Sequence, residues 1–129
     1  MKERMGNGKT IMVVDDSDVA LEIITDDLTE AGFTVLPARS GQEANEVIGT
    51  GYKPDLILLD VMLPGMNGYE FCALVKSKPE TKDIPIIFVS TKDESELKEM
   101  IVKAGANGYL RKAVLTGGGL SKLIEKYLK

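Results

Sequence analysis

The sequence has no histidine and no tryptophan, and it has one cysteine among 129 residues. The lack of histidine excludes Ser-His-Asp and Cys-His catalysis and most zinc sites. Cys72 cannot form a disulfide within the chain, which indicates a reducing, cytoplasmic environment and a packing role for its thiol. Any chemistry must therefore depend on carboxylates, hydroxyls and lysine.

Positive charge and long apolar runs are also scarce. The net charge is −4 and the sequence pI is about 4.9, whereas nucleic-acid surfaces need clustered positive charge. No apolar run approaches the roughly 18 to 20 residues that span a bilayer. We therefore expect no direct nucleic-acid binding and no membrane insertion, and a protein or a cation as the partner.

The chain is organised as one domain with a short leader. Residues 1–9 are polar and aperiodic, which predicts a flexible N-terminal leader before a domain over 10–129. Short apolar runs then alternate with amphipathic helical periods. Gly32 and Gly105 stand where glycines end helices. The expected strands are 10–15, 34–38, 55–60, 85–90 and 107–111.

Five strand-then-helix units in succession are typical of a parallel sheet with helices on both faces. Right-handed crossovers limit how such a sheet can wind. The sequence therefore predicts an α/β, doubly wound, five-stranded parallel sheet of order 2-1-3-4-5 with five helices, which is flavodoxin-like. In that order the first and third strands are neighbours at the topological switch point.

Three acids stand at the ends of those two strands. Asp15 and Asp16 close the first strand, and Asp60 closes the third. The predicted order brings them together, and carboxylates so close must bind a cation or have raised pKa values. Oxygen ligands suit Mg²⁺. The sequence therefore predicts a Mg²⁺ site of Asp15, Asp16 and Asp60.

Two further strand ends add a hydroxyl and an ammonium group. Ser90 and Thr91 end the fourth strand, and Lys112 ends the fifth. Such groups can hold the oxygens of a transferring phosphoryl group while a carboxylate attacks its phosphorus. A simpler interpretation stays open, in which Lys112 only neutralises the acids.

The residues that carry this chemistry lie in a longer pattern. It includes Val13-Val14-Asp15-Asp16 and the segments 54–68, 84–90 and 104–112. Over residues 10–129 the chain resembles the receiver domain of two-component response regulators, in particular the stand-alone, chemotaxis-type regulators. The resemblance implies a signalling switch, not an enzyme, whose phosphoryl group comes from a sensor histidine kinase or a histidine phosphotransfer protein.

The resemblance also implies roles for single residues. Asp60 would accept the phosphoryl group, and Asp15, Asp16 and the backbone carbonyl of Met62 would hold Mg²⁺ with it. Ser90 would be the switch hydroxyl.

The remaining implied roles concern the fifth strand and the output. Lys112 would bind the phosphate, and Tyr109 would be an aromatic that changes rotamer on activation, although a tyrosine taken alone is more often packing. No DNA-binding or enzymatic segment follows in the sequence, so the expected output is an unknown protein target bound through helix 4, strand 5 and helix 5.

Some positions depart from the family pattern. Most receivers have proline after the lysine, but Ala113 stands here, and a trans peptide is expected because cis would cost about 2.5 to 4 kcal/mol. Thr91 replaces a smaller residue and could narrow access to Asp60. The glycine-rich loop 114–119 fits either a flexible joint or an anion cradle.

In this family, the positions two past the acceptor and two past the switch hydroxyl tune the lifetime of the phosphate. They are Met62 and Lys92 here, and neither can orient a water molecule as an acceptor. We therefore expect slow loss of the phosphate.

Two other classes of protein fit the sequence less well. Asp60-Val61-Met62 lacks the second aspartate of aspartate-based phosphohydrolases, and no Ser/Thr-rich loop follows the first strand to hold a flavin phosphate. A receiver-like docking module that takes no phosphate is a nearer alternative. The complete set of acids, hydroxyl and lysine argues against it.

Overall fold

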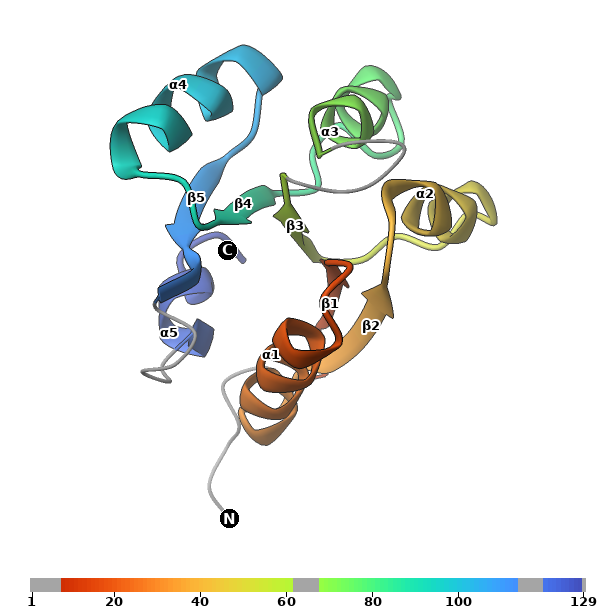
Figure 1. Cartoon of the computed structure of the whole chain (residues 1–129). Coiled ribbons are helices and arrows are strands. Elements are labelled where there is room, and N and C mark those ends of the chain that lie inside the picture. The colour runs from red at the N-terminus through yellow and green to blue at the C-terminus, as the bar shows by residue number, and fades with distance from the viewer. Residues whose placement is uncertain (1–7, 62–67, 114–119, 129) are drawn as a thin grey trace.

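The computed structural model describes residues 8–61, 68–113 and 120–128, in which strands and helices alternate (Figure 1). This order confirms the strand-then-helix pattern, with strand ends shifted by one residue at most. The strands are β1 (Thr10–Val14), β2 (Thr34–Ala38), β3 (Leu56–Asp60), β4 (Ile86–Ser90) and β5 (Gly108–Arg111). The helices are α1 (Asp18–Glu30), α2 (Gly41–Gly49), α3 (Gly68–Ser77), α4 (Glu94–Ala104) and α5 (Leu120–Glu125).

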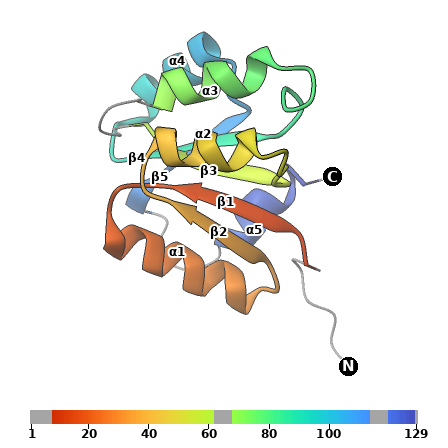
Figure 2. The same cartoon turned by 90° about the vertical axis from the view of Figure 1, so that its right-hand side faces the viewer.

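All five strands are parallel and lie in the order β2-β1-β3-β4-β5, as predicted. Val14 is level with Leu59, so β1 and β3 end side by side. Figure 2 shows α2, α3 and α4 on one face of the sheet and α1 and α5 on the other. The doubly wound, flavodoxin-like fold is confirmed.

Two apolar clusters, one on each face, hold the layers together. Side chains of successive residues in a strand point to opposite faces, so Ile57 and Leu59 join the cluster beneath α2, α3 and α4. Leu56 and Leu58 join the cluster beneath α1 and α5. β3 and β4 are buried over their whole length, in agreement with the continuous apolar runs that precede Asp60 and Ser90.

The helix ends follow the expected signals. The Ser17 side chain caps α1 by accepting a hydrogen bond from the backbone N–H of Ala20. Gly105 ends α4 with φ at 77°, and Gly32 follows α1 with φ at 100°, a region that glycine enters without strain. Both predicted glycine stops are confirmed.

Cys72 lies in the core between α3 and α4, where its thiol donates to the Ala104 carbonyl at 3.4 Å. Burial raises the pKa of this thiol to about 11, above its ordinary value of 9.0. The thiol is therefore a packing group in the folded protein, as expected.

Parts of three expectations lie outside the described residues, namely leader residues 1–7, the loop 114–119 and Met62. The last two leader residues, Gly8 and Lys9, are hydrogen-bonded to Gly32 and Thr34. No peptide bond in the described ranges is cis, which agrees with the trans bond expected before Ala113. None of the described helices has the length and apolarity needed to cross a membrane.

Candidate functional site

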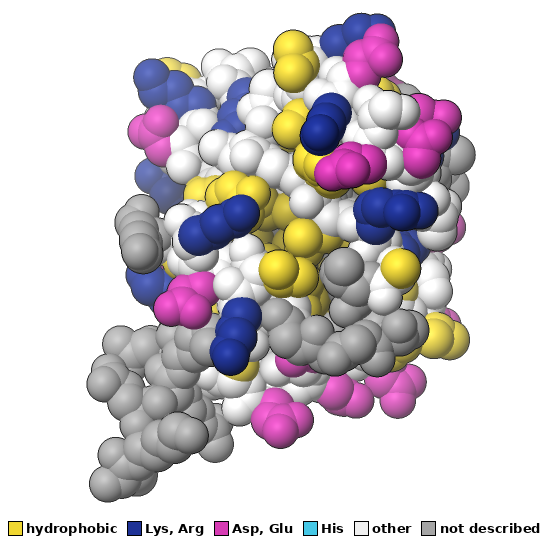
Figure 3. Space-filling view, turned by 90° about the vertical axis from the view of Figure 1, so that its left-hand side faces the viewer, with side chains coloured by type: hydrophobic (Ala, Val, Ile, Leu, Met, Phe, Trp, Pro, Cys, Tyr) yellow, Lys and Arg dark blue, Asp and Glu magenta, His cyan; other side chains and the backbone are white. Residues whose placement is uncertain are grey.

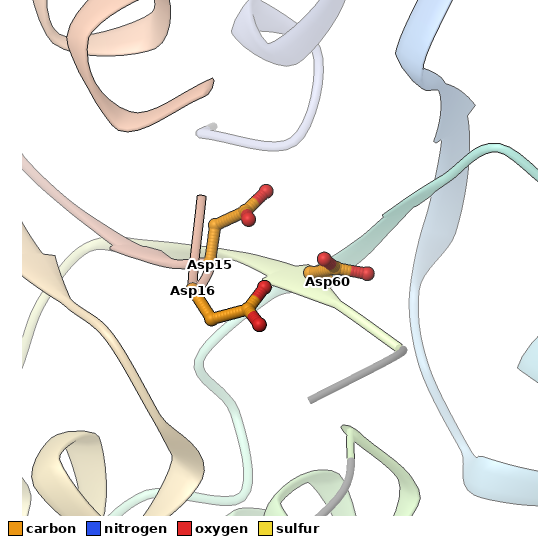
Figure 4. Close-up of side chains that lie close together, drawn as sticks. All are labelled: Asp15, Asp16 and Asp60. Atoms are coloured by element: carbon orange, nitrogen blue, oxygen red, sulfur yellow. The ribbon is translucent and has the colours of Figure 1, made fainter. Parts of the chain in front are cut away.

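The three predicted acids meet at the carboxyl edge of the sheet. Carboxylate oxygens of Asp15, Asp16 and Asp60 all lie within 4.8 Å of one another. Figure 4 shows the side chains close together where β1 and β3 end. Asp15 is 1% exposed and Asp60 is 5% exposed, whereas Asp16 is exposed to solvent. Two of the three carboxylates are therefore buried, and the cluster is open to solvent on the side of Asp16.

The local backbone fixes the carboxylate of Asp15. The Asp15 N–H donates to the Ala38 carbonyl at 3.0 Å and continues the hydrogen-bonding towards β2. One Asp15 oxygen, Oδ1, accepts from the backbone N–H of Ser17 at 2.9 Å. The other oxygen, Oδ2, is left to face the interior of the site.

Lys112 joins the two buried acids. Its Nζ lies 3.0 Å from Asp15 Oδ2 and 3.1 Å from Asp60 Oδ2. Burial acts to lower the pKa of Lys112, but hydrogen bonds and negative charge from both acids outweigh it and raise this pKa above its usual value. Lys112 is therefore a firmly charged ammonium group in contact with the predicted acceptor.

The charge of the cluster is not balanced by Lys112. Burial raises the pKa of Asp15, and this effect exceeds the opposing hydrogen bonds from Ser17 and Lys112. Three carboxylates and one ammonium leave two negative charges in excess when all are ionised. A divalent cation with oxygen ligands matches both the charge and the chemistry of these donors. Mg²⁺ therefore fits this set of residues.

Ser90 and Thr91 are placed differently from each other. Val89 is level with Asp60 in the sheet, so Ser90 lies one residue further toward the carboxyl edge. Ser90 is 1% exposed, and its Oγ accepts from the Lys92 N–H at 3.2 Å. Thr91 is exposed. The Ser90 hydroxyl is thus a buried group at the carboxyl edge of the sheet, whereas Thr91 lies on the protein surface.

Tyr109 lies on β5, level with Phe88, and packs against the cluster beneath α2, α3 and α4. Its hydroxyl donates to Glu94 Oε1 at 2.7 Å. This hydrogen bond raises the pKa of Tyr109 and lowers the pKa of Glu94. Glu94 was not predicted, because nothing in the local sequence links the first residue of a helix to a tyrosine 15 residues later.

The fold and the site together define a doubly wound α/β protein with a carboxylate cluster and a partly buried lysine at its switch point. The model of the response regulator receiver domain family matches residues 11–125. The chain therefore belongs to that family, whose members are signalling switches of two-component signal transduction.

Among known relatives, the chain is similar to the phosphate regulon transcriptional regulatory protein PhoB of Pseudomonas aeruginosa, with 44% identity over 81% of the chain and 45% of PhoB. Protein PilH of the same organism is 36% identical over 81% of the chain and 85% of PilH. The crystal structure of the phosphorylated cyanobacterial phytochrome response regulator RcpA matches with TM-score 0.80 and 28% identity. That match covers 94% of each chain.

Proposed function

We propose that this receiver accepts a phosphoryl group on Asp60, with Mg²⁺, from the phosphohistidine of a sensor histidine kinase or a histidine phosphotransfer protein. The observation that carries the proposal is the position of Asp60. It ends the central strand β3, lies beside Asp15 and Asp16, and has a carboxylate oxygen 3.1 Å from the Lys112 ammonium.

The proposed transfer has a simple balance. An oxygen of ionised Asp60 attacks phosphorus, the phosphorus–nitrogen bond breaks, and the donor imidazole leaves with the electron pair and takes up a proton. Asp15, Asp16 and Asp60, together with the Met62 carbonyl that the resemblance implies, would hold Mg²⁺, which would supply positive charge for the phosphoryl group. Lys112 exchanges its contact with Asp60 for a phosphoryl oxygen, and Asp15 keeps it in place.

The charge excess and the relatives both support this proposal. Lys112 alone leaves the cluster negative, so the simpler interpretation of Lys112 as a neutralising group accounts for only part of the site. RcpA is a phosphorylated response regulator with the same fold. We place the exchange in the cytoplasm, as the single cysteine indicates.

The proposed output is binding to a protein target, not an enzymatic reaction other than the chain's own phosphoryl transfer and dephosphorylation. Figure 3 views the side of the molecule on which α4 lies, where hydrophobic side chains are interspersed with charged ones of both signs. Val102 on α4 is 81% exposed, and Leu123 on α5 is 40% exposed. This mixed surface of α4, β5 and α5 suits a protein partner, whereas the net charge of −4 disfavours nucleic acid.

The test uses acetyl phosphate and Mg²⁺ as the phosphorylation mixture and a phosphate-affinity gel as the readout. The wild type should shift, and Asp60→Asn should not. Asp26→Asn, which removes an exposed acid of α1, should shift like the wild type. An equal shift in Asp60→Asn would overturn the assignment, and no shift in the wild type would favour the docking module that takes no phosphate.

A further inference from the structure

We propose that Glu94 is a positioning residue that acts through Tyr109: its carboxylate holds the tyrosine hydroxyl at the start of α4 and so opposes the phosphorylated state. We call the hydrogen bond between Tyr109 and Glu94 the latch. The inference rests on the proposed function of Asp60. Neither the formation of the fold nor the chemistry of the acid site requires a carboxylate at Glu94.

The latch joins a helix to an edge strand of the sheet. Tyr109 is in the middle of β5, and Glu94 is the first residue of α4. Their 2.7 Å hydrogen bond therefore ties the first turn of α4 to the neighbouring strand. A tyrosine hydroxyl that donates to a carboxylate makes a charge-assisted hydrogen bond, which is stronger than one between neutral groups.

The other polar groups nearby do not replace this contact. Lys98 approaches Glu94 only to 4.0 Å, and both of these side chains are 63% exposed, so their pairing is weak. Asp93 is committed to capping α4, since its Oδ1 accepts from the Glu96 N–H and the Ser95 hydroxyl. Tyr109 is therefore the strongest partner that the described structure gives to Glu94.

The latch acts on the same face of the sheet as Ser90. Phe88 and Tyr109 are level neighbours that contribute to one apolar cluster. Ser90 is two residues past Phe88, so the period of two in a strand points it to that face as well. A tyrosine ring that turned toward Ser90 would have to give up Glu94. Phosphorylation that favours such a turn thus works against the latch, and removal of the latch shifts the population toward the active state.

The experiment measures the affinity for beryllofluoride, which mimics an aspartyl phosphate, by amide NMR titration in the presence of Mg²⁺. Glu94→Ala should bind about two- to fivefold more tightly than the wild type, because an exposed pair contributes little more than that. Glu94→Gln retains an acceptor oxygen without the charge and should lie between the two. In a Tyr109→Phe background, which has no hydroxyl to hold, Glu94→Ala should change the affinity no further.

Glu99→Ala is the matched control. Glu99 is an exposed acid of α4 with its own lysine four residues on, Lys103 at 3.3 Å, so its removal reproduces the loss of charge and of a helical pair. It should bind beryllofluoride as the wild type does. The thermal unfolding temperature of each variant distinguishes loss of stability from loss of the latch. A variant that is only destabilised would bind beryllofluoride more weakly.

The possible outcomes separate the two proposals. Equal affinities for the wild type and Glu94→Ala would overturn the latch alone, and so would a gain that persists in the Tyr109→Phe background. If Asp60→Asn bound beryllofluoride as well as the wild type does, the proposed function would be overturned, and the latch with it.

Discussion

The acid site and the region of α4 and β5 are built in opposite ways. Asp15 and Asp60 are buried, stand at the ends of hydrogen-bonded strands and share one ammonium group. The start of α4 is exposed and is joined to β5 by the side-chain hydrogen bond from Tyr109 to Glu94. Rigid elements hold reacting groups accurately, whereas weakly tied elements can change position at low energetic cost. The contrast suits a protein in which chemistry at one region moves the other.

The largest expected effect concerns the shared ammonium. Lys112→Ala leaves Asp15 and Asp60 without their common partner in a buried site, so the free energy of unfolding at neutral pH should fall by about 3 kcal/mol. Mg²⁺ should restore part of this stability and bind more tightly than to the wild type, because three carboxylates then have no competing cation. Urea denaturation with and without Mg²⁺ measures both effects. If the variant bound Mg²⁺ more weakly, Lys112 would have a different role at the acid site.

A second effect tests how the far end of α4 is held. The folded protein keeps the Cys72 thiol neutral up to about pH 11, whereas the unfolded chain ionises it near pH 9.0. The stabilising contribution is therefore complete below pH 9 and is lost as the pH rises toward 11. Its size is of the order of 2 kcal/mol.

Cys72→Ala provides the comparison for this prediction. The wild type should lose its advantage in unfolding free energy over the variant as the pH rises from 9 to 11. Titration of the lysines over the same range affects both proteins and cancels in the comparison. A constant difference across this range would show that the thiol is not buried between α3 and α4 as the hydrogen bond to Ala104 indicates.

The third effect concerns the exposed member of the acid cluster. Asp16→Ala should weaken Mg²⁺ binding by at least about tenfold and slow phosphotransfer with it, because one oxygen ligand and one charge are lost. Isothermal titration calorimetry gives the affinity, and Asp26→Ala controls for the loss of an acid outside the cluster. Unchanged affinity in Asp16→Ala would place the cation elsewhere.

The same contrast separates what the sequence could predict from what it could not. The sheet order and the meeting of Asp15, Asp16 and Asp60 followed from apolar runs that end at acids, because parallel strands bring their carboxyl ends to one edge. Here local pattern and global fold agree. The acid cluster therefore needed no knowledge of side-chain conformation.

Contacts between side chains of distant elements were not predictable in this way. The Asp27 carboxylate of α1 accepts from the Leu120 N–H of α5, 93 residues away. The contact between Glu94 and Tyr109 likewise depends on the packing of α4 against β5 and on two rotamers. No spacing in the chain encodes such pairs, since they arise only once the layers have packed.

The smallest expected effect is on the lifetime of the phosphate. The Lys92 N–H donates to Ser90 Oγ, and its ammonium lies 3.5 Å from Glu96. An ammonium group has no lone pair with which to orient an attacking water. We therefore expect slow decay of the aspartyl phosphate, and a several-fold faster decay in the double variant Met62→Asn, Lys92→Glu. Decay of purified phosphoprotein is the measurement, with Lys103→Glu as a charge control at the other end of α4. A wild type that decays as fast as the double variant would show that these two side chains do not shield Asp60.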